Sequence, residues 1–133
     1  MALDYGSKRT GIAVSDRLKM IASPLDTVKT EQLLSFLSTY LQREEVETIV
    51  VGLPVDLMNR ETHGTKGALK ITKKIKAQFP DIGVVNADER FTSKMAFEGI
   101  LASGIPKKKR TDKELVDKLS ATIILQSYME QMT

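Results

Sequence analysis

Three acidic residues, Asp4, Glu89 and Asp117, lie beside or within apolar segments of the chain. Asp4 directly follows the apolar lead 1–3, Glu89 comes soon after the apolar run 82–85, and Asp117 interrupts the apolar stretch 115–119. A carboxylate at the end of a buried segment is costly unless it is paired, hydrogen-bonded or bound to a cation. Each of these acids therefore needs a partner.

Each acid also has an explanation that involves no chemistry. Asp4 can form a turn through hydrogen bonds to its own backbone. Glu89 can pair with Arg90 or cap a helix that begins near Thr92, and Asp117 can be favoured by the dipole at the start of a helix. These alternatives apply to each acid taken singly.

Taken together, the three acids indicate a metal site. Three carboxylates at one point repel one another strongly, and a divalent cation removes that penalty. Oxygen ligands without His or Cys select Mg²⁺ or Mn²⁺. Two such ions about 3.5–4 Å apart can activate water and stabilise the leaving oxygen in phosphodiester hydrolysis. The acids therefore predict a metal-dependent nuclease.

The distribution of positive charge fits a polyanionic substrate. The formal net charge is +3 and the pI is about 9.1. Lysines cluster over 66–76, and the run 107–110 is wholly basic. Such clusters attract phosphate backbones without reading their sequence. The alternative is that they are the solvated surfaces of a helix and a loop.

Composition excludes several other kinds of site. The 133 residues include no cysteine, which excludes disulfides, a thiolate nucleophile and a zinc site with Cys ligands. The single histidine cannot form a metal site built from several His ligands. A hydrophobic fraction of 41% and a charged fraction of 28% are typical of a globular protein. No apolar run reaches the length of a membrane span, and no signal peptide is visible. We expect one domain, 1–133, located in the cytoplasm and with no membrane partner.

Hydrophobic patterns predict five strands and four helices. The expected strands are 1–4, 12–14, 20–23 (ended by Pro24), 48–53 and 82–85. The expected helices are 33–41 (with Thr30 as N-cap), 68–79, 92–103 and a last helix from the capping box 111–114 to about residue 128. The segment 55–67 is predicted to be a loop. Gly6 and Gly11 mark positions where the backbone bends or is approached closely.

This order of elements predicts an α/β fold. Three antiparallel strands followed by two parallel strands form a five-stranded mixed sheet with helices on both faces. Right-handed crossovers place the first strand in the middle of that sheet. Ligands of such sheets bind beyond the carboxyl ends of the parallel strands, where we expect Asp4 and Glu89. Asp117, with the small residues Ser120 and Ala121 one turn further on, can approach the same place.

Four motifs, in the same order, resemble the YqgF/RuvX family of ribonuclease-H-like nucleases. They are DYGSKRTGIAVSD at 4–16, VVGLP at 50–54, DERFTS at 88–93 and VDKLSATIILQSY at 116–128. Together they span essentially the whole chain. The stretch 55–61 lacks the Asp-Gly that the family often has after Gly-Leu-Pro. Only three residues precede Asp4, so the first strand is short here or further residues precede it.

The resemblance implies a ribonuclease H-like fold, with Asp4, Glu89 and Asp117 as the catalytic, metal-binding acids. It implies a nuclease that holds Mg²⁺ or Mn²⁺, with two ions expected, and that matures the 5′ end of precursor 16S rRNA. The family is also described as resolvases of Holliday junctions, which are four-way DNA. We therefore expect a nucleic-acid partner, structured precursor rRNA or branched DNA, bound by a monomer or a weak homodimer.

Three basic residues near these motifs are candidates for contacts to substrate phosphates. They are Lys8, Arg9 and Arg90. The alternative for each is an ordinary surface ion pair.

Two other classes of function remain open from the sequence. The segment Asp4-x-Gly6-Ser7 resembles the first phosphate loop of actin-like kinases, but those proteins enclose a nucleotide between two lobes. A nucleic-acid-binding module without catalysis would bind RNA equally well after Asp4→Asn and would never cut it. Aromatic residues make up only 5% of the chain, so base stacking is not an evident mode of recognition.

Overall fold

The computed structural model describes residues 1–53, 63–88 and 113–132. In chain order, its elements are β1 (Ala2–Asp4), β2 (Arg9–Ser15), β3 (Ala22–Lys29), the short 3₁₀ helix η1 (Thr30–Gln32), α1 (Leu33–Arg43), β4 (Thr48–Leu53), α2 (His63–Gln78), β5 (Gly83–Asp88) and α4 (Lys113–Gln131). The predicted helix 92–103 and the basic run 107–110 fall outside these residues, as do the predicted site residues Glu89 and Arg90.

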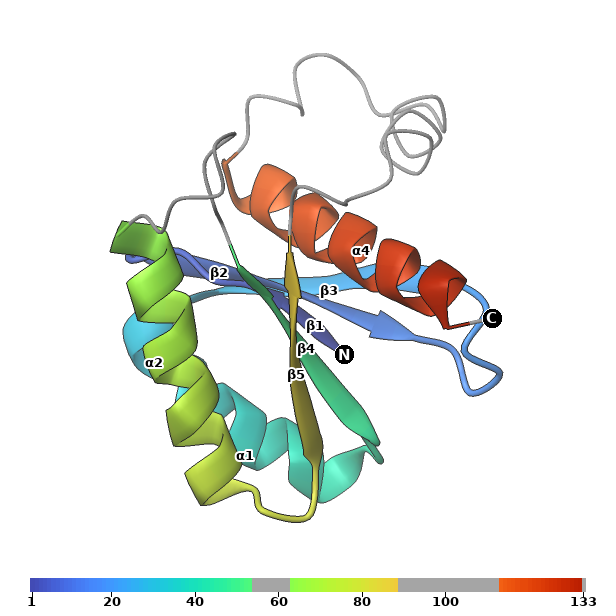
Figure 1. Cartoon of the computed structure of the whole chain (residues 1–133), viewed down its shortest axis with the longest axis horizontal. Coiled ribbons are helices and arrows are strands. Elements are labelled where there is room, and N and C mark those ends of the chain that lie inside the picture. The colour runs from blue at the N-terminus through green and yellow to red at the C-terminus, as the bar shows by residue number, and fades with distance from the viewer. Residues whose placement is uncertain (54–62, 89–112, 133) are drawn as a thin grey trace.

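One mixed sheet organises the structure (Figure 1). Its strand order is β3-β2-β1-β4-β5, with β1 in the middle, as the sequence predicts. β1 pairs antiparallel with β2 and parallel with β4, and β4 pairs parallel with β5. The carboxyl ends of the three parallel strands therefore lie at one edge of the sheet. Asp4 and Asp88 are the last residues of β1 and β5 at that edge.

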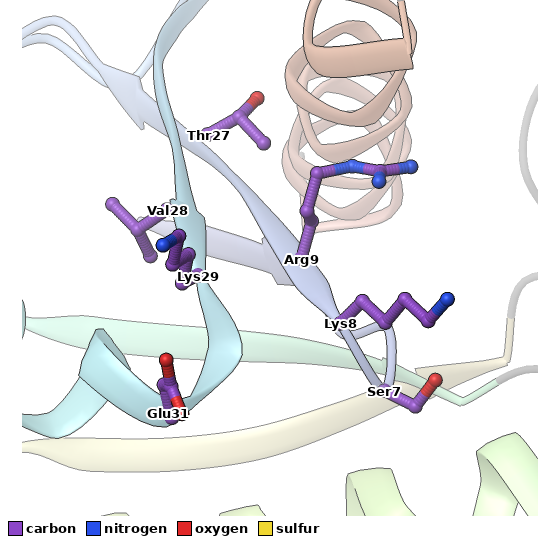
Figure 2. A pocket seen from close by; sticks show the side chains of 7 residues that line it. All are labelled: Ser7, Lys8, Arg9, Thr27, Val28, Lys29 and Glu31. Carbon is purple, nitrogen blue, oxygen red and sulfur yellow. The ribbon is translucent and has the colours of Figure 1, made fainter.

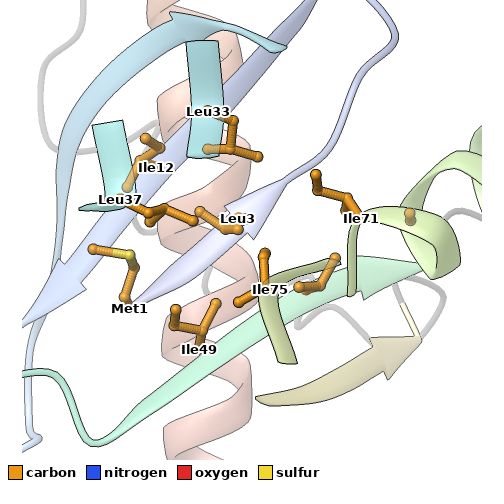
Figure 3. Close-up of a cluster of buried hydrophobic side chains, with 10 residues drawn as sticks. Met1, Leu3, Ile12, Leu33, Leu37, Ile49, Ile71 and Ile75 are labelled. Carbon is orange, nitrogen blue, oxygen red and sulfur yellow. The ribbon is translucent and has the colours of Figure 1, made fainter. Parts of the chain in front are cut away.

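Each face of the sheet is covered by helices (Figure 1). On one face, Leu3 and Ile12 are fully buried against α1 and α2, in the cluster that Figure 3 shows. On the other face, Ala2 and Ala13 pack against α4. Successive side chains of a strand point to opposite faces, which explains why Ala2 and Leu3 belong to different clusters. Burying large aliphatic side chains such as Leu3 contributes about 1.5–3 kcal/mol each.

The third strand differs from the prediction. β3 passes through Pro24 and continues to Lys29, whereas the sequence predicts an end at Pro24. Proline lacks a backbone N–H, so it is tolerated in edge strands and beside bulges. β3 is an edge strand, and Pro24 pairs with Ala13 directly beside a register shift between Ile12 and Ala13. Both conditions are met, so β3 can contain Pro24 and still pair with β2 on either side of it.

Two further local predictions are wrong. Thr30 does not cap α1, because it belongs to η1 and its hydroxyl donates to the carbonyl oxygen of Gly6, 2.5 Å away. The predicted loop 55–67 overlaps α2, which already begins at His63. The first residues of α2 are polar and include Gly64 and Gly67, so the apolar periodicity that predicts a helix begins only at Ala68.

Two glycines allow helices to approach the sheet closely. A Cβ atom at Gly11 of β2 would lie 1.9 Å from the backbone oxygen of Asp117 in α4. A Cβ atom at Gly67 of α2 would lie 2.6 Å from the ring of Tyr5, which follows β1. Both distances are far below van der Waals contact. The sequence prediction that the chain is approached closely at Gly11 is therefore confirmed.

Within the described ranges, no helix is both long enough and apolar enough to cross a membrane.

The contact between Gly11 and α4 predicts a strong effect of a single methyl group. Gly11→Ala should lower the free energy of unfolding by about 3 kcal/mol, the upper end of the cost of overpacking, because the backbone of α4 must move away from β2. Chemical denaturation monitored by circular dichroism measures this change.

Gly83→Ala provides the matched control, because a Cβ atom there would meet its nearest neighbours at 3.6 Å. That variant should stay within about 1 kcal/mol of the parent. Equal stability of the two variants would contradict the close approach of α4.

Candidate functional site

Asp4 ends the central strand on the face that α4 covers. Ala2 packs in the cluster beneath α4, and alternation along the strand points Asp4, two residues later, to the same face. Its side chain is partly buried. Asp4 pairs in register with Gly11 of β2.

Asp117 reaches the same place from the far end of the chain. Its backbone lies directly on Gly11, the register partner of Asp4. Any side chain at position 11 would hold α4 away from this point of the sheet. Because Gly11 has no side chain, a carboxyl residue of β1 (Asp4) and a carboxyl residue of α4 (Asp117) occupy adjacent positions on the same face of the sheet.

Arg9 forms an ion pair with Asp117. It starts β2, two residues before Gly11, and Figure 2 shows its side chain extending toward α4. Its Nε donates a hydrogen bond of 2.9 Å to Oδ2 of Asp117. The side chains of Arg9 and Asp117 are 35% and 25% exposed, so this ion pair is only partly shielded from water. The pair neutralises part of the negative charge and orients the Asp117 carboxylate.

Of the other three predicted site residues, the structure describes only Lys8. Lys8 is exposed in the turn between β1 and β2. Glu89 and Arg90 lie outside the described residues. β5 ends at Asp88, which pairs with Leu53 at the same edge of the sheet as Asp4.

The fit to a metal ion can be judged from the two acids that are described. Asp4 and Asp117 supply only oxygen donors, which suits Mg²⁺ or Mn²⁺. Among the described residues, no group of three or more His, Cys, Asp or Glu side chains forms a metal site. The described donors therefore fit a hard divalent cation in chemistry and supply two of the three predicted carboxylates.

Asp16, the second acid of the first motif, serves the fold. Its Oδ1 accepts hydrogen bonds from the backbone N–H groups of Met20 (2.7 Å) and Ile21 (3.0 Å), which close the turn between β2 and β3. These two bonds, with that from Ile21 the stronger cause, lower the pKa of the Asp16 carboxyl group. Asp16 therefore remains ionised as a turn-forming residue, at the end of β2 away from Asp4.

Sequence reasoning missed the roles of two residues beside this site, Thr30 and Lys29. The Thr30 hydroxyl donates to Gly6 and meets the Thr10 hydroxyl at 2.9 Å, so it ties the β1–β2 turn to the end of β3. Lys29 pairs in register with Arg9. Neither role has a local signal in the sequence, because both depend on how β3 aligns with β2.

Comparison with known proteins places the chain in a family. The family described as "RuvX: Holliday junction resolvase" matches residues 1–131. The chain belongs to the RuvX family. It is 48% identical over 130 residues to proteins of Phocaeicola vulgatus and Bacteroides thetaiotaomicron, each named "Putative pre-16S rRNA nuclease". Each alignment covers 98% of this chain and 94% of the relative.

This membership confirms the predicted resemblance and the predicted nuclease class, and hence a hydrolase. A solved structure supports the fold. The chain is similar to the Fowlpox virus resolvase in its complex with Holliday junction DNA, with a TM-score of 0.57, 15% identity and coverage of 98% of this chain and 95% of that one. The predicted α/β, ribonuclease H-like sheet is thereby confirmed.

The Arg9–Asp117 pair predicts a measurable coupling. In a double-mutant cycle of Arg9→Ala and Asp117→Ala, the coupling free energy should be about 0.5–1 kcal/mol, the range of partly exposed ion pairs. It should fall when the salt concentration is raised to 1 M, because salt screens exposed charges. Urea denaturation of the four proteins measures it. Additive effects of the two changes at low salt would show that the pair does not stabilise α4 on the sheet.

Proposed function

We propose that this chain is a metal-dependent nuclease that processes the 5′ end of precursor 16S rRNA. The observation that carries the proposal is the convergence of Asp4 and Asp117 through the contact of α4 with Gly11. The substrate is supported by the names of relatives that are 48% identical over nearly the whole chain. Such a role would take place in the cytoplasm, with residues 1–133 acting as one nuclease domain.

In this proposal Asp4, Glu89 and Asp117 hold the divalent cations. Glu89 directly follows Asp88, the last residue of β5, at the carboxyl edge of the sheet. Mg²⁺ or Mn²⁺, with two ions expected, would supply Lewis-acid stabilisation of the phosphate oxygens and activate a water molecule. The three carboxylates lie far apart in the sequence, so they can meet only in the folded chain.

The basic residues around the acids would bind and orient the substrate. Arg9 keeps the Asp117 carboxylate in place through its hydrogen bond and offsets the repulsion between the acids and an approaching phosphate. Lys8, exposed in the neighbouring turn, and Arg90 would contact backbone phosphates. Such contacts position a nucleic acid without reading its sequence.

A second candidate substrate is four-way DNA. The description of the family and the Fowlpox virus resolvase both point to Holliday junctions. Symmetric cutting of a four-way junction requires two sites related by a twofold axis, and hence a dimer. The proposed rRNA role requires only one site, so it is compatible with a monomer or a weak homodimer.

The test is cleavage of two labelled substrates, one an RNA that carries the 5′ leader junction of precursor 16S rRNA and the other a four-way DNA junction. We expect cutting of the RNA with Mg²⁺ or Mn²⁺, and none with EDTA. Asp4→Asn and Asp117→Asn should each lower the rate by more than about 100-fold, since loss of even an outer partner of a metal ligand costs about 10–100-fold.

Asp81→Asn is the matched control, because Asp81 is an exposed acid before the amino end of β5, at the opposite edge of the sheet. Its rate should equal that of the parent. Paired symmetric nicks in the junction, without cutting of the RNA, would make four-way DNA the substrate. Binding of both nucleic acids without any cutting would replace the nuclease with a binding module.

A further inference from the structure

A basic hollow lies beside Arg9, the ion-pair partner of Asp117, between the β1–β2 turn and the end of β3 (Figure 2). Its volume is about 520 Å³. Three cationic side chains line it, those of Lys8, Arg9 and Lys29, together with one acid, Glu31. Three positive charges less one negative charge leave a net charge of +2 on its walls. The hydroxyls of Ser7 and Thr27 add neutral hydrogen-bonding groups.

The register of the sheet forces two of these cations together. Arg9 of β2 stands opposite Lys29 of β3. Like charges at directly opposite positions of antiparallel strands are unfavourable. Arg9 is compensated by its bond to Asp117. Lys29 makes no ion pair with any residue in the described part of the chain, and neither does Lys8. The arrangement therefore leaves two lysines that line one hollow without an ionic partner among the described residues.

The wall of the hollow is fixed by hydrogen bonds rather than by a loose loop. The backbone N–H of Thr30 donates to the carbonyl oxygen of Lys8 at 3.0 Å. The Thr30 hydroxyl donates to Gly6, and it meets the hydroxyl of fully buried Thr10. These three bonds join the β1–β2 turn to the segment that carries Lys29. A site whose backbone is already ordered loses little entropy when it binds a ligand.

We propose that this hollow binds a backbone phosphate of the nucleic-acid strand, next to the phosphate that lies at Asp4 and Asp117, through Lys8 and Lys29. Arg9 borders both the hollow and Asp117, so the two places are adjacent along the path of a strand. Ammonium groups bind phosphates as point charges, without the fixed geometry that a guanidinium requires. The inference rests on the proposed function in one respect, that the substrate is a nucleic acid.

Binding without cutting tests the new contact. The probe is the labelled leader RNA in EDTA, titrated by fluorescence anisotropy at several salt concentrations. Lys29→Gln should reduce the slope of log K against log [salt] by about 0.7, the contribution of one phosphate contact in a single strand. Arg43→Gln, which removes the same charge from an exposed site in the last turn of α1, should leave the slope unchanged.

The position of the contact is tested by replacing single linkages of the RNA with neutral deoxy-methylphosphonates. At one linkage beside the expected cut, the replacement should weaken binding to the parent protein, and it should cause a smaller loss with Lys29→Gln, in which Lys8 alone remains to contact that phosphate. An unchanged salt slope for Lys29→Gln, or equal sensitivity of both proteins at every linkage, would overturn the proposed subsite.

Cleavage of the RNA with Mg²⁺ distinguishes failure of the proposed subsite from failure of the proposed nuclease function. Cutting of the RNA together with an unchanged salt slope would overturn the subsite and leave the nuclease intact. A reduced slope without any cutting would support the subsite and overturn the nuclease. No binding of the RNA by the parent protein would overturn the subsite and the RNA substrate together.

Discussion

The structure depends on one close contact, the backbone of α4 at Asp117 resting on Gly11 of β2. This contact sets the distance between the helix and the sheet at the point where β1 ends. Asp4 is the register partner of Gly11, so the contact that packs α4 on the sheet also places Asp117 near Asp4. Packing and chemistry therefore cannot be separated at this position, and a side chain on residue 11 would disturb both.

The β1–β2 turn is held from several directions. Tyr5 packs against Gly67 of α2 on one face, while Arg9 bonds to Asp117 of α4. Thr30 ties the turn to the end of β3. Because these contacts fix the backbone of the turn, they keep its cationic side chains close to the acids. Arg9 offsets the charge of Asp117, and Lys8 and Lys29 remain available on the side of the solvent.

Much of this arrangement can be predicted from the sequence, because its signals are local. Apolar runs and turn residues give the strand order, and Asp4 at the end of an apolar run gives the edge of the sheet. The Arg9–Asp117 pair joins residues 108 positions apart, which no local pattern can reveal. The pairing of Lys29 with Arg9 depends on a register shift between Ile12 and Ala13 and on a strand that continues through Pro24. Such features follow from packing, so they appear only in three dimensions.

We propose that Asp4 and Asp117 belong to one metal centre. Titration of Mn²⁺ into the protein by isothermal calorimetry tests it without any substrate. We expect the parent and Asp81→Asn to bind Mn²⁺ alike, and Asp4→Asn and Asp117→Asn, shown by thermal melting to be folded, each to bind it at least about 10-fold more weakly. Binding of Mn²⁺ by Asp117→Asn with the affinity of the parent would contradict the account, because the helix would then deliver no ligand to the site.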